Sequence, residues 1–146
     1  MNLTKHFTLD ELTFSETAKR HGIDNTPDEE VIDNLKILAE LLEQVREVLG
    51  GKPIHITSGY RSPQVNQMVG SKSTSDHIRG LAADFVCPNF GRPHAVVSEL
   101  VASGLPYKQV IREFDAWTHL SCPAKGETPK REALIIDKLG TRLFTL

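Results

Sequence analysis

The sequence predicts an α+β fold in which N-terminal helices pack on a small antiparallel sheet. Two observations predict it: helix-forming patterns fill the first third of the chain, and short strand-like segments dominate its end. Strands and helices would alternate throughout a parallel doubly wound fold. A length of 146 residues suits one domain. We therefore expect a single domain over residues 1–146, with a helical part over about 1–51 and a sheet part over about 52–146.

Two helices are expected in the N-terminal part. Thr8 and Glu11 have the spacing of a capping box and Gly22 is a typical helix stop, so the first helix should cover LDELTFSETAKRH. The second helix should begin near Pro27 and end at Gly50-Gly51. Its apolar residues recur with a helical period: Val31, Leu35, Leu38, Leu42, Val45 and Val48.

Short elements follow. PIHITS alternates apolar and polar residues and predicts a strand, RSPQVNQMVG predicts a short helix, and the polar segment GSKSTSDHIRG predicts a loop. LAADFVC is typical of a buried strand and GRPHAVVSELVASG of a helix. The remaining predicted strands are KQVIREF, WTHLSC, EALIID and RLFTL.

Composition argues against two kinds of partner. The net charge is −2 and the basic residues are dispersed among acids, so there is no basic surface for a nucleic acid. No apolar run approaches the roughly 20 residues that span a bilayer, and MNLTKHFTLDEL lacks the apolar region of a signal peptide. We expect a monomer that is made in the cytoplasm without a signal peptide and does not insert into a membrane.

The two cysteines, Cys87 and Cys122, are interpreted as buried free thiols. Two cysteines are too few for a disulfide scaffold, and they lack CxxC spacing. A cross-strand disulfide remains an alternative if the fold brings the two segments together.

Three residues suggest a metal centre. His77 and Asp84 are separated by six residues, and His119 follows on a predicted strand. Two imidazoles and one carboxylate are a standard ligand set for a catalytic zinc ion, which keeps its fourth position for water. Gly80 permits a bend that would fold His77 back toward Asp84. Each residue alone also has a structural interpretation, as a surface histidine or a capping aspartate, but the combination favours a zinc hydrolase.

The same residues resemble a known family. SGYRSPQVNQMVGSKSTSDHIRGLAADF is similar to the S-G-Y-R-S … S-x-H-x-x-G-x-A-x-D signature of zinc D-alanyl-D-alanine carboxypeptidases and related phage endopeptidases of peptidoglycan. Trp117-Thr118-His119 matches the W-x-H segment of that family. FTLDELTFSETAKRHGIDNTP resembles the N-terminal part of its single-domain, phage-type members, so the resemblance covers nearly the whole chain.

The resemblance implies a role for each matching residue. His77, Asp84 and His119 would bind one zinc ion, and Arg61 and Ser75 would hold the substrate. A guanidinium suits a carboxylate or carbonyl because its fork donates two parallel hydrogen bonds. The structural alternatives are a surface charge for Arg61 and a capping hydroxyl for Ser75.

The activity that the resemblance implies is hydrolysis of a peptide bond in bacterial peptidoglycan. The enzyme would be a D-Ala carboxypeptidase or a stem or crossbridge endopeptidase that lyses or remodels the cell wall. It would act at the wall or periplasm, with phage delivery as an endolysin as one route. Two alternatives stay open: a noncatalytic zinc-stabilised wall-binding or virion module, and an enzyme that acts on a soluble dipeptide or small amide.

The general base departs from the family pattern. Relatives carry Asp or Glu three residues before the last His, where this chain has Ala116. If residues 114–116 form a hairpin loop, Glu113 lies diagonal to His119 at about 7 Å, a distance that its side chain can bridge to the attacking water. Glu113 is therefore favoured as the base over Asp115, which would have ordinary turn chemistry. If neither carboxylate reaches the water, the chain would be a binding-only relative of these enzymes, without hydrolytic activity.

Overall fold

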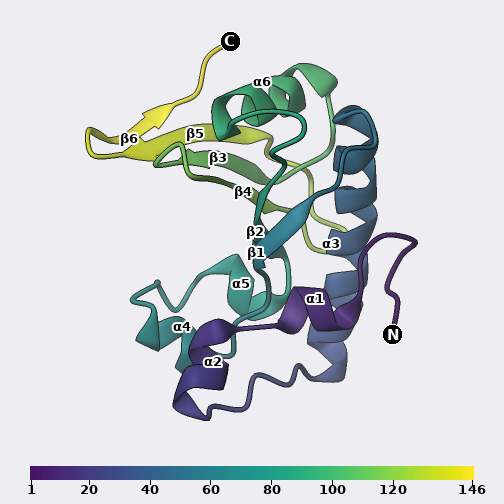
Figure 1. Ribbon diagram of the computed structural model, residues 1–146, viewed down its shortest axis with the longest axis vertical. Coiled ribbons are helices and arrows are strands. Elements are labelled where there is room, and N and C mark those ends of the chain that lie inside the picture. Colours follow the sequence, from purple (N-terminus) through teal and green to yellow (C-terminus); the bar gives the residue numbers. More distant parts are fainter.

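The computed structural model describes residues 1–146 as helices packed around one six-stranded sheet (Figure 1). The helices are α1 (Leu9–Thr13), α2 (Glu16–His21), α3 (Glu29–Val48), α4 (Pro63–Met68), α5 (Asp76–Arg79) and α6 (Pro93–Ser103). The strands are β1 (His55–Ser58), β2 (Ala82–Val86), β3 (Gln109–Glu113), β4 (Trp117–Ser121), β5 (Glu132–Asp137) and β6 (Gly140–Leu143). The predicted α+β class is confirmed. No helix combines the length and the apolar character needed to cross a bilayer.

The sheet has the strand order β1-β2-β4-β3-β5-β6. Four of its neighbouring pairs are antiparallel, as predicted, whereas β3 and β5 run parallel. The parallel pair arises because β4 ends beside the start of β3, and the ten residues after β4 cross that end of β3 so that β5 begins on its other side. There the Glu132 N–H donates to the carbonyl of Lys108 at 3.1 Å. The last hairpin, β5–β6, therefore extends the sheet on the β3 side.

The first predicted helix is two helices. The capping box is confirmed, because Thr8 accepts the Glu11 N–H at 3.1 Å and the Glu11 carboxylate accepts the Thr8 N–H at 3.3 Å. Phe14, however, has an extended backbone, and Ser15 caps a second helix by accepting the Ala18 N–H at 3.1 Å. A serine that satisfies an open N–H group offers the chain a new helix start. The prediction of one continuous helix was therefore wrong.

The polar segment predicted as a loop contains the short helix α5. Ser75 caps it by accepting the His77 N–H at 3.2 Å, and Gly80 ends it in the left-handed conformation with φ 75°. A single turn lacks the apolar periodicity by which helices are recognised in a sequence. Because α5 forms, His77 projects from a helical turn and not from a loop.

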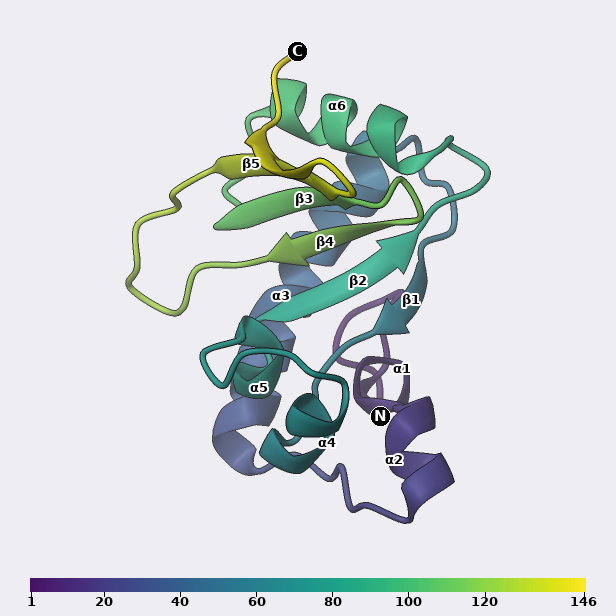
Figure 2. The same ribbon diagram turned by 90° about the vertical axis from the view of Figure 1, so that its left-hand side faces the viewer.

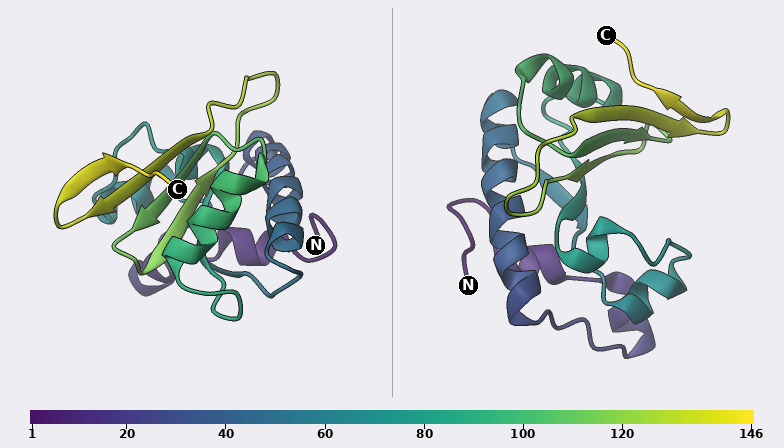
Figure 3. Two further views of the ribbon diagram at one scale, coloured as in Figure 1. Left: turned by 90° about the horizontal axis from the view of Figure 1, so that it is seen from above. Right: turned by 180° about the vertical axis from the view of Figure 1, so that it is seen from behind.

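The core lies between α3, α6 and one face of the sheet (Figure 2). The apolar stripe of α3 buries Leu35, Leu38, Leu42 and Val45, and α6 packs over β3 and β4. Seen from behind in Figure 3, α3 runs along one side of the molecule. The sheet projects from one end of α3, and the small helices α1, α2, α4 and α5 lie at the other. The second face of the sheet is thus left facing α4 and α5.

Both cysteines are buried free thiols, as predicted. Cys87 follows the end of β2, while Cys122 follows the end of the antiparallel strand β4. The two residues therefore lie at opposite ends of the β2–β4 pair, because neighbouring antiparallel strands end at opposite edges. The cross-strand alternative does not form.

Candidate functional site

The three residues predicted as metal ligands meet at the middle of the sheet. Asp84 on β2 is directly opposite His119 on β4, and α5 places His77 beside them. Asp84 Oδ1 lies 2.9 Å from His119 Nδ1 and 3.5 Å from His77 Nε2. One donor atom from each residue lies within 4.8 Å of the other two. Residues separated by up to 42 positions in the sequence thus form one cluster.

A backbone contact orients the ring of His77, and strand pairing places His119. His77 Nδ1 donates to the carbonyl oxygen of Gly59 at 2.8 Å, which leaves Nε2 facing Asp84. His119 is held by its strand, in which its neighbours Thr118 and Leu120 point to the opposite face and are buried. A histidine that binds a metal ion usually donates its other ring N–H to a backbone carbonyl or a carboxylate, which fixes its tautomer and orientation.

The cluster fits a zinc ion. Tetrahedral ligand atoms bound at about 2.0–2.2 Å lie about 3.3–3.6 Å from one another. The distance of 3.5 Å between Asp84 and His77 falls in that range, and the 2.9 Å between Asp84 and His119 is slightly shorter. Two imidazole nitrogens and one carboxylate also match the donor set that catalytic zinc takes, with the fourth position free. His77, Asp84 and His119 therefore form a group that can hold a metal ion.

The protonation states also suit a metal. Burial lowers the pKa of His77, although the neighbouring Asp84 opposes this, so His77 is neutral at neutral pH and its nitrogen is available. Burial alone would raise the pKa of Asp84, but the hydrogen bond with His119 and the proximity of His77 outweigh it and hold that pKa well below its usual range. Neutral imidazole and ionised carboxylate are the forms that bind metal.

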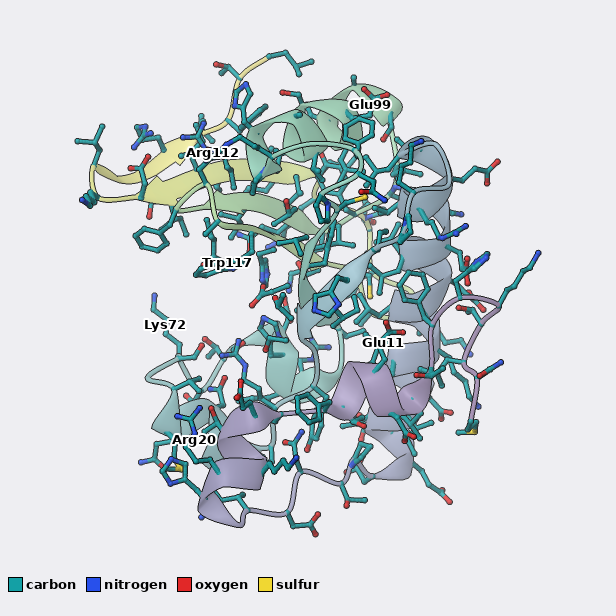
Figure 4. All side chains as sticks on the ribbon, viewed as in Figure 1. Glu11, Arg20, Lys72, Glu99, Arg112 and Trp117 are labelled. Carbon is teal, nitrogen blue, oxygen red and sulfur yellow. The ribbon has the colours of Figure 1, made fainter.

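The cluster lies in an open groove of about 620 Å³ between two walls. We call one the sheet wall, formed by strands β2 to β5, and the other the loop wall, formed by residues 59–62 and 70–77. Figure 4 shows Trp117 projecting from the sheet wall and Lys72 from the loop wall, on opposite sides of the groove opening. A substrate in this groove would contact both walls.

Glu113 lies on the sheet wall as predicted. The β3–β4 turn makes Glu113 face Trp117, which places it diagonal to His119 on the same side of the sheet. Burial raises the pKa of Glu113, as does Asp84, while His119 and Arg61 oppose them. A half-buried carboxylate with a raised pKa that lines a groove has the properties of a general base.

The turn that places Glu113 is unusual. The Glu113 carbonyl accepts the Ala116 N–H at 2.9 Å. The two central residues of the turn, Phe114 and Asp115, have positive φ angles of 52° and 50°. Positive φ at both central positions defines the type I′ turn, which matches the twist of a hairpin. Phe114 takes this conformation at a steric cost and contacts Trp117, with ring centroids 6.1 Å apart.

Asp115 does not line the groove. Its carboxylate accepts hydrogen bonds from Arg92 at 2.7 and 3.1 Å and from the His94 N–H at 3.3 Å. It lines a separate cavity with Ala116, at the start of α6. The structure therefore brings Glu113 to the metal cluster and ties Asp115 to a different part of the protein.

Arg61 and Ser75 both line the groove on the loop wall. The Arg61 side chain is half-buried, and its guanidinium makes no hydrogen bond or ion pair within the chain; burial lowers its pKa, against the pull of Asp84 and Glu113. Ser75 caps α5, so its oxygen already accepts one hydrogen bond, while its O–H stays available as a donor. The structural interpretation of Ser75 is thus correct and leaves room for a second role.

Sequence reasoning missed several contributors to the groove. Ile111 and Ile136 give the sheet wall an apolar stretch, and Ile136 reaches it only because β5 pairs in parallel beside Glu113. The Gly59 carbonyl, which orients His77, belongs to the SGYRS segment but leaves no side-chain signal. Neither a long-range strand pairing nor a backbone acceptor can be read from local pattern.

Comparison with known proteins assigns the geometry to a family. A family model described as Peptidase M15 matches residues 5–121, which include both walls up to the end of β4. No curated protein matches the sequence. The match leaves out β5 and β6.

Proposed function

Because this chain belongs to the M15 family of zinc-dependent D-Ala-D-Ala carboxypeptidase-like metallopeptidases, we propose that it hydrolyses a peptide bond in bacterial peptidoglycan. The observation that carries the proposal is the convergence of His77, Asp84, His119 and Glu113 in one open groove. A metal-binding triad and a carboxylate with a raised pKa on the same face are the parts that metal-assisted hydrolysis requires.

The three clustered residues would hold one zinc ion. When bound, zinc supplies a Lewis acid for the scissile carbonyl and lowers the pKa of water toward about 7. The protein contributes the rigidity of that site: Asp84 and His119 are paired across two strands, and Gly59 fixes the ring of His77. Preorganised ligands of this kind need little movement during the reaction.

Glu113 would act as the general base and then as the acid. Its carboxylate takes a proton from the attacking water and returns it to the leaving amine. The pKa raised by burial keeps the carboxylate basic enough to accept the proton, and the side chain stays ionised above that raised value. Arg61, which has no partner within the chain, would bind a carboxylate or carbonyl of the substrate, and Ser75 would donate to it.

We place the site of action at the cell wall, where a lytic or remodelling enzyme meets its substrate, and we propose that the protein works there as a monomer. The phage-type resemblance of its N-terminal part supports delivery as an endolysin-like protein. The products of hydrolysis distinguish a carboxypeptidase, which would release a terminal D-Ala, from an endopeptidase, which would cut within the stem or crossbridge. The open form of the groove supports a polymeric substrate over a small soluble dipeptide.

The test is release of amino groups from purified peptidoglycan by the zinc-loaded protein, with mass spectrometry of the products. We expect Glu113→Gln to lower kcat by about 10²- to 10⁴-fold while zinc content stays unchanged. Asp115→Asn is the matched control, because it removes a nearby carboxylate that does not line the groove. Its activity should stay near wild type.

A chelator should abolish the release, and returning zinc should restore it. Tight zinc binding without any release by the wild type would overturn the proposal in favour of a noncatalytic wall-binding module. Equal losses in Glu113→Gln and Asp115→Asn would overturn the assignment of the base.

A further inference from the structure

We propose that Asn25 is a positioning residue that aims Arg61 into the groove, an inference that rests on the role of Arg61 in the proposed function. Asn25 lies in the segment between α2 and α3, 36 positions before Arg61 in the sequence. It touches neither the metal cluster nor the groove, so it would act only through Arg61.

The side-chain amide of Asn25 binds both peptide groups that flank Arg61. Its Nδ2 donates to the carbonyl of Tyr60 at 3.1 Å, and its Oδ1 accepts the Ser62 N–H at 2.7 Å. The first group belongs to the peptide before Arg61 and the second to the peptide after it. One amide therefore constrains both backbone torsions of Arg61, in the way that a neighbouring strand would.

A third contact anchors this clamp to the N-terminal helices. Nδ2 of Asn25 also donates to the carbonyl of Thr13, at the end of α1, at 2.8 Å. The Tyr60 N–H donates to the carbonyl of Leu12 in the same helix at 2.8 Å. The loop that carries Arg61 is thus fixed to α1 from two sides, which gives the N-terminal segment a function in the site.

Arg61 depends on its backbone for its direction. Its guanidinium has no hydrogen bond or ion pair within the chain, and its buried Nε lacks a partner. Residues 59–62 belong to no helix or strand, so no regular ladder holds them. Two further backbone restraints act here: the Arg61 N–H donates to the carbonyl of His77 at 3.1 Å, and the Ser62 carbonyl accepts the Asn66 N–H at 2.9 Å. Because no hydrogen bond or ion pair holds the guanidinium, its direction depends on the conformation of the Arg61 backbone.

Only an amide satisfies the three contacts. Two of them need an N–H donor and one needs an acceptor, and asparagine carries both on one group. Aspartate has the same shape but only acceptors, so it would face the carbonyls of Thr13 and Tyr60 with negative charge. Asn25→Asp is therefore the sharpest variant, and Asn25→Ala tests the loss of the group alone.

The first measurement is a double-mutant cycle on peptidoglycan hydrolysis with Asn25→Asp and Arg61→Ala. A misplaced binding group costs about 10- to 100-fold, so we expect Asn25→Asp to lower kcat/KM by that factor, mainly through KM, with zinc content unchanged. In the Arg61→Ala background the same substitution should change kcat/KM by less than about twofold, because non-additivity marks residues that act together.

The matched control is Asn34→Asp, since the Nδ2 of Asn34 also donates to one backbone carbonyl, that of Arg79, at 2.9 Å. It should leave kcat/KM near wild type. Equal losses from Asn25→Asp with and without Arg61 would overturn the proposal, because they would show a general effect on folding.

The second measurement does not depend on activity. The order parameter of the Arg61 amide, measured by ¹⁵N relaxation, should fall from about 0.85, typical of a rigid backbone, toward about 0.6 in Asn25→Asp. An unchanged value would overturn the proposal even if activity falls. If Arg61 loosens but the wild type hydrolyses no peptidoglycan, the proposed function fails and the positioning role of Asn25 stands.

Discussion

The sheet wall and the loop wall place their functional residues by different physical means. On the sheet wall, Asp84, Glu113 and His119 project from paired strands, and every residue before and after them is bound to a neighbouring strand. Their direction follows from the register, because side chains alternate along a strand. A shift of one residue would turn all of them to the other face.

The loop wall has no such ladder. Arg61, Ser75 and His77 come from irregular backbone and one helical turn. Individual hydrogen bonds to residues far away in the sequence hold the backbone beside Arg61 and the ring of His77, whereas Ser75 is held by bonds to Lys72 and His77. We therefore expect the two halves of the site to fail in different ways. The loss of one contact on the sheet wall leaves the neighbouring strand pairs in place, whereas the loss of one contact on the loop wall should free part of the loop.

The largest effect is expected where the walls meet, at the proposed metal ligands. His77→Ala, on the loop wall, and His119→Ala, on the sheet wall, should each lower zinc affinity by more than about 100-fold, since the loss of an outer-shell partner alone costs 10- to 100-fold. The loss of zinc affinity is measured as zinc content after dialysis and by competition with a chromophoric chelator. Hydrolysis should be lost in the same variants.

His55→Ala is the control for these two variants, because His55 is an exposed histidine on β1 that does not line the groove. Zinc affinity that survives either ligand substitution would show that the ion is bound elsewhere.

The next largest effect is expected at Gly59 on the loop wall. A Cβ at this position would lie 2.3 Å from the carbonyl oxygen of Leu12, so Gly59→Ala must push the loop away from α1. We expect a loss of about 1–3 kcal/mol in the free energy of unfolding, the usual cost of overpacking. The rate of hydrolysis should fall as well, because the Gly59 carbonyl orients His77 and because Arg61 lies only two residues further along the same loop. Urea denaturation and kcat/KM measure the two effects.

Gly126→Ala separates the clash from the backbone cost. Gly126 has a positive φ of 85° and nothing within 4 Å of an added Cβ. It should therefore lose about 1 kcal/mol of stability from the left-handed conformation alone and keep its activity. If Gly59→Ala keeps full activity, the contact with α1 does not set the loop wall.

The difference between the walls also explains what could be predicted from the sequence. Glu113 was placed correctly because alternation along a strand and a hairpin turn are local rules. On the loop wall, the metal-ligand pattern indicated His77, whereas Arg61 and Ser75 were named only by family resemblance, without the contacts that support them. Asn25 could not be found, because nothing in the sequence around it indicates that its amide binds peptide groups beyond α3.

Two features of the fold were also missed. The first predicted helix breaks at Ser15 because a capping contact competes with helix propensity. The β3–β5 pair is parallel because strands that are not adjacent in the sequence pair with each other.

The smallest effect is expected at the β5–β6 turn, where an ion pair between side chains adds to the backbone pairing of the two strands. The Asp137 carboxylate accepts two hydrogen bonds from Arg142 at 2.8 and 2.9 Å and one from the Leu139 N–H at 2.9 Å. These contacts, led by Arg142, lower the pKa of Asp137 to about 2. A depressed pKa adds stability that is present above the unfolded value of about 3.9 and lost as pH falls toward the folded one.

Asp137→Asn should therefore lower Tm slightly at pH 7, and the difference from wild type should shrink as pH falls from 5 toward 2. Exposed ion pairs contribute little, so we expect a small shift. Thermal unfolding at several pH values measures it, with Glu132→Gln on the same strand as the control for removing one charge. A difference that stays constant over this range would show that the ionised carboxylate of Asp137 does not stabilise the turn.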